Sequence, residues 1–557
     1  MTSPNPHLTA ALAADPYAAL VGARLLDFFA DTTPWPRRLW DVSSVLALSE
    51  AHEAGRWQAR QVLSSGAVSW YLHALERQLG PDRGLGDSRL RRLLTVLLRS
   101  GLGPSSPERR QLEQLLPLIR SGYLERWRDA VEARPAPSAE SLARAIATHL
   151  LDLGHSSGQL HRWVRGLIEK PETTLGDLLD SACAHARRDD AAFEVLVPFR
   201  SVPDHQRLAA HLPEWRTATD SAAWFATNQV TKPPRQYGSF LFTITAKDPT
   251  AAARVAGALV QRLQARAAYA RGESGSRLEP VGHVWIAGHS ARPMASPARG
   301  VDVLSLVREK TMYATASQDM LDDALEMAAP LNGGPPAPAV SGGWSAIEAL
   351  LSQASDTAEG KLGRVVAADR LAAIVACSWP RAELTALSYR HDPDAPDALS
   401  RRLLVSRRSL DRCRAVAEAI RAGHPIGTRN ASDTAAVQRM SALLADPHRE
   451  LGGVRAVFEL ALRRLYRQRN IIVHGGTTSS VALDATLRIA GPLIGAGLDR
   501  LVHAKLAANT GPLELAARAA NSLELVGADV GPSIVAMLEW PVARITGKRP
   551  AAADGGP

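Results

Sequence analysis

The segment LYRQRNIIVHGG, residues 465–476, holds the residues whose types and spacing are best suited to chemistry. Histidine takes up and releases protons near neutral pH, so His474 is a candidate general base. The guanidinium of Arg469 can stabilise charge that builds on a phosphate, and Asn470, one turn before His474, can orient the ring or the phosphate. These groups could draw the proton from an RNA 2′-hydroxyl, whose oxygen then attacks the adjacent phosphate, without a metal ion or other cofactor. We expect products with 2′,3′-cyclic phosphate and 5′-hydroxyl ends, and no action on DNA.

The helix that must position these residues raises a geometric question. At about 100° per residue, Arg469 and His474 lie roughly 140° apart around an ideal helix, whereas Arg463, Arg467, Asn470 and His474 form one stripe. Three solutions are open: the helix ends near His474, as the following Gly-Gly indicates; Arg469 reaches round the helix; or two chains pool their motifs.

The surroundings of this segment distinguish it from two other Arg-x-x-x-x-His matches. RAIATH at 144–149 has Ala in the polar position, and RSVPDH at 200–205 contains a proline. RNIIVH instead resembles the Arg-polar-x-x-x-His signature of HEPN domains, small helical bundles of which many are metal-independent ribonucleases. Tyr466 precedes the motif, aliphatic residues lie between its polar ends, Gly-Gly follows it, and the helix WSAIEALL lies upstream. In these features the chain most resembles the ApeA-like HEPN group of prokaryotic defence proteins. The resemblance covers less than a third of the chain.

The resemblance implies a metal-independent endoribonuclease, acting as a regulated toxin in anti-phage defence by abortive infection. It also implies a homodimer through the HEPN bundle, because these nucleases usually place two motifs face to face. Glu348 resembles the acidic residue that approaches the motif arginine, although a solvent-facing glutamate is the alternative. The partner would be RNA, with tRNA among the candidates, and an unknown trigger would act on the N-terminal region. A second hypothesis is a HEPN module that binds RNA or a partner without cutting.

The charge balance fits a polyanionic partner. Lys and Arg number 65 against 56 Asp and Glu, with a net charge of +9, and a sequence pI of about 9.7. Only seven of the basic residues are lysine, which favours bidentate phosphate contacts or reflects a GC-rich genome. The arginines predicted to contact RNA are Arg463 and Arg467 beside the motif and Arg401, Arg402 and Arg408 upstream; a solvated helix face is the alternative for the upstream group.

Other site classes find little support. The three cysteines include no CxxC pair, and His149, His155 and His161 recur at a spacing that does not stack on one helix face, so we expect no metal site. Gly288-His289-Ser290 lacks the second glycine of a nucleophile elbow, and no Walker or GxGxxG motif occurs. No apolar stretch reaches membrane-spanning length and the N-terminus lacks a signal-peptide pattern, which predicts a cytoplasmic protein with no membrane partner.

The patterning of the chain predicts a mostly α fold. Apolar residues at three- and four-residue spacing predict helices, whereas AAFEVLVPF and YGSFLFTIT are typical of strands. Tryptophans in the first helices are expected in the core. NGGPPAPAVSGG is expected to be a linker, because Pro and Gly disfavour helix. The predicted organisation is a helical sensor or regulatory domain (1–190), a small α+β domain (191–331), a linker (332–343), a HEPN-like bundle (344–510), a helical extension (511–545) and a disordered tail (546–557).

Overall fold

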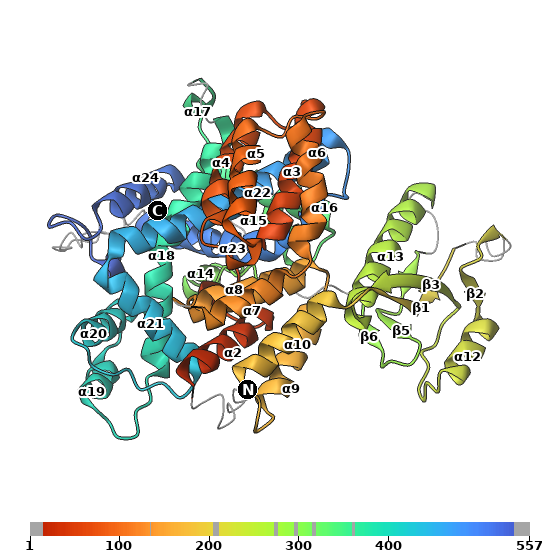
Figure 1. The fold of residues 1–557 in the computed structure, drawn as a ribbon, viewed down its shortest axis with the longest axis horizontal. Helices are drawn as coiled ribbons and strands as arrows, with labels where there is room; N and C mark the ends of the chain where they lie inside the picture. The colour runs from red at the N-terminus through yellow and green to blue at the C-terminus, as the bar shows by residue number, and fades with distance from the viewer. Residues whose placement is uncertain are drawn as a thin grey trace, which may run out of the picture.

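The structure is a computed structural model that describes residues 15–133, 135–203, 211–271, 277–294, 299–314, 319–358 and 363–539. It is mostly α-helical with one small antiparallel sheet, which confirms the predicted fold class. A large helical body lies beside a smaller unit that holds the sheet (Figure 1). Within these described ranges, no helix combines the length and apolar composition that crossing a bilayer requires. The predicted tail, 546–557, lies outside the described residues.

The residues before the sheet form short helices with clear start signals. Side chains of Ser43 and Asp87 accept hydrogen bonds from backbone N–H groups of the first turn, which have no partner within the helix. Trp40 and Trp57 are almost fully buried, as expected for core tryptophans. The elements are α2 (Pro16–Phe29), η1 (Trp35–Arg37), α3 (Ser44–Ala59), α4 (Ser65–Leu79), η2 (Arg83–Leu85), α5 (Ser88–Ser100), α6 (Pro107–Arg120), α7 (Tyr123–Glu132), α8 (Ala139–Asp152), α9 (Ser157–Ile168) and α10 (Leu175–Arg187).

The sheet contains both predicted strands and is covered by a helix on each face. Its strand order is β2-β3-β1-β5-β6, with β4 also paired to β1, and every pair is antiparallel. Alternation sends Val195 and Val197 to the face under α13, whereas Leu196 packs with Phe225 of α12 on the other face. The elements are β1 (Ala191–Ser201), β2 (Trp215–Thr217), α12 (Ala218–Thr227), β3 (Gly238–Ala246), α13 (Pro249–Arg271), β4 (Glu279–Pro280), β5 (His283–Ile286) and β6 (Arg292–Pro293).

The residues after the sheet form the rest of the helical body around α18, which packs against α16, α20, α21, α22, α23 and α24. The elements are α14 (Ser305–Arg308), α15 (Met320–Ala328), η4 (Ala329–Asn332), α16 (Pro336–Leu351), α17 (Ser355–Ala358), η5 (Gly363–Val365), α18 (Val366–Arg390), α19 (Ala398–Val405), α20 (Ser409–Arg421), α21 (Ala431–Ala445), α22 (Pro447–Gly475), α23 (Leu483–Ala508), α24 (Pro512–Leu525) and η6 (Ile534–Ala536).

The predicted linker at 332–343 is wrong over most of its length, because residues 336–343 are the first turns of α16. Prolines in a first helical turn cost no internal hydrogen bond, since those N–H groups have no helical partner anyway. The glycines serve close packing: a Cβ on Gly342 would lie 2.1 Å from the Met327 carbonyl oxygen, and one on Gly343 would lie 2.9 Å from Leu331 Cδ1. These residues are therefore a tight helix contact, and not a flexible tether.

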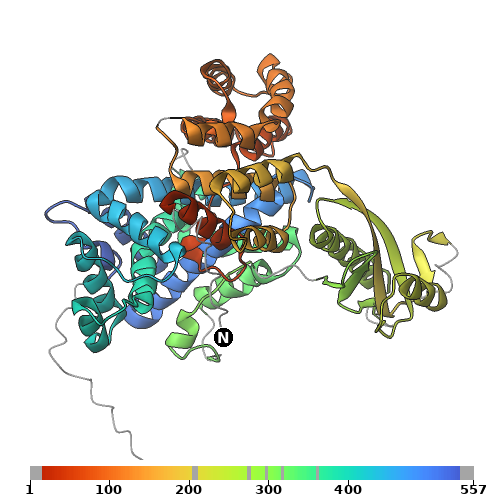
Figure 2. The ribbon, with the colours of Figure 1, turned by 60° about the horizontal axis from the view of Figure 1, so that its bottom comes forward.

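The predicted boundaries also need correction, because the first and last helices share one core. Trp40 makes edge-on ring contacts to Trp379 of α18 and Phe458 of α22, with centroids 5.8 Å and 4.9 Å apart. Val301 and Leu321, assigned from sequence to the α+β domain, belong to this core as well. Figure 2 shows α2 lying among the later helices. The described helices before the sheet, from α2 to α10, thus form one body with those after it, and the separate unit is the sheet with its two helices.

Buried charges reinforce this union. The Arg37 guanidinium, 2% exposed, binds Glu383 of α18 at 2.9 Å and Asp433 of α21 at 2.7 Å. Burial alone would raise the pKa of Glu383, but Arg439 and Arg37 hold it below its ordinary value. Such carboxylates tie helices far apart in sequence to one arrangement.

Candidate functional site

The helix α22 carries the predicted motif at its C-terminal end. Its start is capped by Asp446, which accepts a hydrogen bond from the Arg449 backbone N–H. Its end is set by Gly476, whose φ of 66° is left-handed and suits glycine. The helix therefore stops directly after His474, as the Gly-Gly pair predicted.

Arg469, Asn470 and His474 are brought together within one chain. Arg469 Nη1 lies 3.0 Å from His474 Nε2 and 3.1 Å from Asn470 Oδ1. The arginine side chain thus reaches round the helix, and Asn470 steadies it on the way. The sequence left three arrangements open. The structure has two of them, since the helix ends just after His474 and the Arg469 side chain reaches round the helix. Arg469 and His474 therefore pair without a second chain.

The three motif residues differ in their exposure to solvent. His474 is exposed, Arg469 is half-buried and Asn470 is 8% exposed. Because the guanidinium can only donate, His474 Nε2 accepts in this contact and the ring proton lies on Nδ1. An acceptor ring nitrogen at the surface is what a general base requires.

Tyr466 and Glu348 lie in a supporting cluster with Trp344. The rings of Trp344 and Tyr466 are 4.7 Å apart between centroids, which packs α16 against α22. Trp344 Nε1 donates to Glu348 Oε2 at 2.8 Å. The Trp344–Glu348 bond lies within α16 and orients the indole ring that packs on Tyr466 of the motif helix.

Arg463 and Arg467 are buried, so the prediction that they bind RNA is wrong. Arg463 is 7% exposed, binds Asp369 and stacks 3.8 Å from the Trp70 ring centroid. Arg467 is 3% exposed, binds the Glu50 carboxylate and stacks on Tyr71. The stripe that they form with the motif faces helices α3 and α4, which the sequence pattern could not indicate.

Glu50 is the centre of this buried contact. Its carboxylate binds Arg464 at 2.7 Å and Arg467 at 2.9 Å, and the Tyr71 hydroxyl donates to it at 2.9 Å. Burial alone would raise the pKa of Glu50, but the two arginines lower it to about 2. The carboxylate therefore stays ionised, and α3 is fixed to the helix that carries the motif.

The arginines at 401–408 are exposed, but they lie on another part of the body. Arg402 pairs with Glu418 at 2.5 Å, and Arg401 and Arg408 are exposed on α19 and at the start of α20. Helix α20 packs on α18 and α21, and α19 packs on α20, at the lower left of Figure 1, whereas α3 and α6 lie at the top of the helical body. The solvated-face alternative fits this group, and the structure does not bring it to His474.

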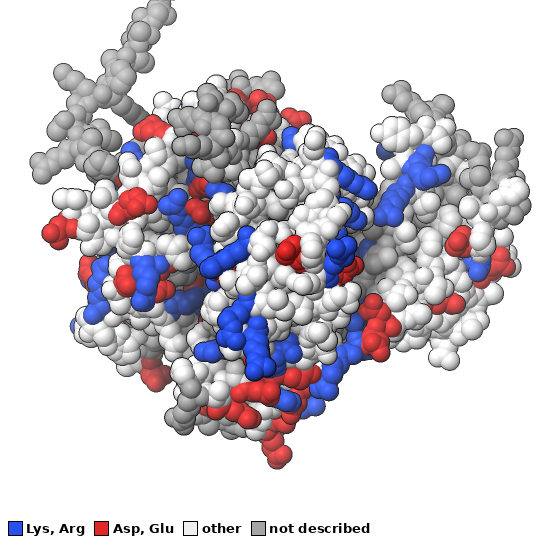
Figure 3. Space-filling view, turned by 45° about the horizontal axis from the view of Figure 1, so that its top comes forward, with Lys and Arg blue, Asp and Glu red and all other residues white. Residues whose placement is uncertain are grey.

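Arginines missed by the sequence prediction lie beside the motif instead. A Cβ on Gly475 would lie 2.9 Å from Trp57 Cζ3, so α3 abuts the end of α22. The guanidinium groups of Arg56 and Arg60 cover the Trp57 ring at 4.7 Å and 5.5 Å from its centroid, and both residues are exposed. Figure 3, with the top of the molecule turned forward, shows a band of basic side chains across the middle of the body. No sequence signal joins residues 56–60 to 469–474; only the fold does.

His149 and His155, which the sequence analysis did not assign to a metal site, have structural contacts. His149 is 2% exposed against the Tyr123 ring, and burial lowers its pKa to about 3. His155 is 3% exposed and its Nε2 lies 3.1 Å from the His185 carbonyl oxygen. Among the described residues, no group of His, Cys, Asp or Glu is placed to hold a metal ion.

Comparisons of the chain with protein-family models, curated proteins and solved structures found no match.

Proposed function

We propose that this protein is a HEPN-type, metal-independent RNA endonuclease whose reacting groups are Arg469, Asn470 and His474. One observation carries the proposal: an arginine and a histidine from opposite sides of a helix meet at 3.0 Å on its solvent-exposed end. The pair supplies a phosphate-binding cation and a proton acceptor in contact, which cleavage by a 2′-hydroxyl needs.

The reaction begins with competition for the guanidinium. In the free protein the lone pair of His474 Nε2 accepts a hydrogen bond from Arg469 Nη1. An RNA phosphate is a stronger partner for a guanidinium than a neutral imidazole, so binding draws Arg469 to the phosphate and frees Nε2. The base becomes available only when substrate is bound.

The chemical step is then a transesterification. His474 Nε2 takes the 2′-hydroxyl proton, the 2′-oxygen forms a bond to phosphorus, and the bond from phosphorus to the 5′-oxygen breaks. The leaving 5′-oxygen takes a proton from water, and His474 gives its proton to the hydroxide that remains. The products are a 2′,3′-cyclic phosphate and a 5′-hydroxyl, with the histidine neutral again. Arg469 stabilises charge on the non-bridging oxygens, while Asn470 holds the arginine.

The biological setting is a second part of the proposal. A freely active RNA endonuclease damages its own cell, so we infer a regulated toxin acting on cytoplasmic RNA, tRNA among the candidates, in anti-phage defence. A homodimer with two motifs face to face is proposed from the HEPN resemblance. Light scattering on the purified chain tests it, and a monomer at assay concentration would contradict it.

The decisive experiment compares wild type, His474→Ala and His448→Ala on total RNA in EDTA. His448 is an exposed histidine at the opposite end of α22, so its variant is a matched control. We expect cyclic-phosphate fragments from wild type and His448→Ala, and none from His474→Ala, which should still bind RNA. Binding without cleavage by wild type, in buffer and in infected-cell lysate, would instead support the non-catalytic module.

A further inference from the structure

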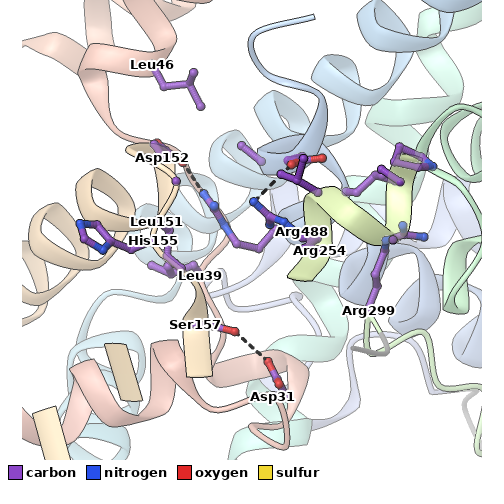
Figure 4. Close-up of a pocket in the computed structure, with 18 of the residues that line it drawn as sticks. Asp31, Leu39, Leu46, Leu151, Asp152, His155, Ser157, Arg254, Arg299 and Arg488 are labelled. Carbon is purple, nitrogen blue, oxygen red and sulfur yellow. Dashed lines mark hydrogen bonds and ion pairs between the residues drawn. The ribbon is translucent and has the colours of Figure 1, made fainter. Parts of the chain in front are cut away.

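A cavity of about 410 Å³ lies at the joint between the sheet-bearing unit and the helical body. Figure 4 shows Arg254 of α13 on one side, facing Arg488 of α23 and Asp152 at the end of α8. Small-molecule sites commonly occupy such junctions and have volumes of roughly 300–1,000 Å³. Neither the sequence motif nor the proposed nuclease uses this cavity.

Two guanidinium groups in its wall, those of Arg38 and Arg299, are held by backbone carbonyl oxygens, and carboxylates act on them only from a distance: Asp31 and Asp302 on Arg38, and Asp484 on Arg299. Arg299 donates to the carbonyl oxygens of Pro330, Leu331 and Gly334 at 2.9–3.2 Å. Arg38 likewise donates to backbone carbonyl oxygens, including that of Thr33 at 2.6 Å. In the described parts of the chain, neither forms an ion pair with Asp or Glu, and burial lowers the pKa of both guanidinium groups.

The Arg38 guanidinium lies close to the backbone segment that carries Arg299. The Arg38 guanidinium sits over Gly300, 2.9 Å from where a Cβ would stand, and Arg299 is the preceding residue. Backbone carbonyls hold both side chains in place without neutralising them. The result is two positively charged groups that are held in fixed positions in the cavity wall.

The wall holds four arginines and three aspartates, of which Asp31 accepts a hydrogen bond from the Ser157 hydroxyl at 3.2 Å. Asp152 accepts from Arg488 at 2.6 Å and from the Ser43 backbone N–H at 2.7 Å. Arg254 lies 3.6 Å from Asp484, and the buried Arg488 Nε has no hydrogen-bond partner among the residues that the structure describes. The cavity therefore has more cationic donors than acidic acceptors.

We propose that this cavity binds a small phosphate-bearing molecule. The forked donors of arginine match phosphate oxygens, and the fixed Arg38 and Arg299 would meet them with little reorganisation. Leu39 and Leu151 supply an apolar wall for the remainder of the ligand (Figure 4). The cavity is partly open to solvent, and its volume and its position at a joint suit a small molecule.

A bound anion would bridge the sheet-bearing unit and the helical body. Arg254 belongs to the first, whereas Arg38 and Arg488 belong to the second. The proposal concerns binding alone and does not depend on ribonuclease activity.

Isothermal titration of the full chain with inorganic phosphate, pyrophosphate, AMP and ATP tests the proposal. We expect saturable one-to-one binding of at least one probe, weakened about tenfold or more in Arg254→Gln and Arg38→Gln. Arg262→Gln, an exposed position on α13 outside the cavity, is the control and should bind as wild type. Arg254 is exposed, so its variant stays informative if the half-buried Arg38 variant does not fold.

The pattern of probes identifies the source of the phosphate. Tighter binding of AMP or ATP than of pyrophosphate indicates a nucleotide, and the reverse indicates an inorganic anion. Absence of saturable binding by all four probes would overturn the proposal, as would equal binding by wild type and both cavity variants. Binding of a single-stranded RNA oligomer alone would overturn it too.

Discussion

The Glu50 carboxylate accepts two hydrogen bonds from Arg467, at 3.2 Å from Nε and 2.9 Å from Nη2, with both side chains 4% exposed. The two residues are 417 positions apart in the chain. Arg467 lies two residues before Arg469, so this contact fixes the helix turn from which the motif projects. The N-terminal helices are therefore part of the scaffold of the site.

Replacing Glu50 by Gln should lower the free energy of unfolding by about 3–5 kcal/mol, because Arg464 and Arg467 would keep buried charges without a counterion. Urea unfolding followed by circular dichroism measures the change. Glu113→Gln, whose side chain is 59% exposed, should alter stability by less than about 0.5 kcal/mol. Equal stability of wild type and Glu50→Gln would contradict the scaffold described for α3.

Replacing Arg469 by Lys should reduce cleavage about 10²- to 10³-fold while leaving the fold intact. A lysine ammonium cannot bind Asn470 and a phosphate with the same planar fork, so transition-state charge is less well stabilised. Single-turnover cleavage of a short RNA measures the rate, and Arg449→Lys, at the exposed start of α22, is the control. A lysine variant as fast as wild type would remove Arg469 from the reacting groups.

The sequence predicted those parts of the molecule that depend on neighbouring residues. Strands β1 and β3, helix α22 and its Gly476 end follow from local periodicity, β-branched residues and turn chemistry. The Arg469–His474 pairing was left open, because a flexible arginine can reach across an angle that helix arithmetic alone opposes.

Contacts between distant segments could not be predicted. Arg463 and Arg467 looked like surface cations, since nothing in the pattern shows that α3 and α4 cover them. Gly342 and Gly343 looked like linker residues, since glycine provides flexibility in a loop and close approach in a helix pair alike. The burial of the two arginines depends on α3 and α4, which come from the N-terminal part of the chain. The close packing of the two glycines depends on α15 and η4.

Replacing Gln468 by Met should raise stability by about 1–3 kcal/mol. Gln468 is fully buried on α22, and its amide nitrogen and oxygen both lack hydrogen-bond partners within the described residues. An unsatisfied buried amide costs free energy that an apolar side chain of similar shape does not. Thermal unfolding measures the gain, and an unchanged or lower stability would indicate that water satisfies the amide.

The pH dependence of stability should include a contribution from His149. Burial lowers its folded-state pKa from 6.5 to about 3, and Arg120 and Arg126 add to the effect. The unfolded chain takes up a proton below pH 6.5, which the folded protein does not until about pH 3. Stability from this residue is therefore complete above its unfolded pKa and is lost as pH falls toward 3.

Between pH 7.5 and pH 5.0 this linkage should cost wild type about 2 kcal/mol of unfolding free energy. His149→Leu cannot titrate, so its loss over the same interval should be smaller by about that amount, whatever its stability at pH 7.5. His73→Leu, at an exposed helix position, should lose as much unfolding free energy as wild type over this pH interval. Urea unfolding of the three proteins at both pH values measures the change in unfolding free energy between pH 7.5 and pH 5.0. An equal change in wild type and His149→Leu would mean that the buried ring accepts a proton in the folded state.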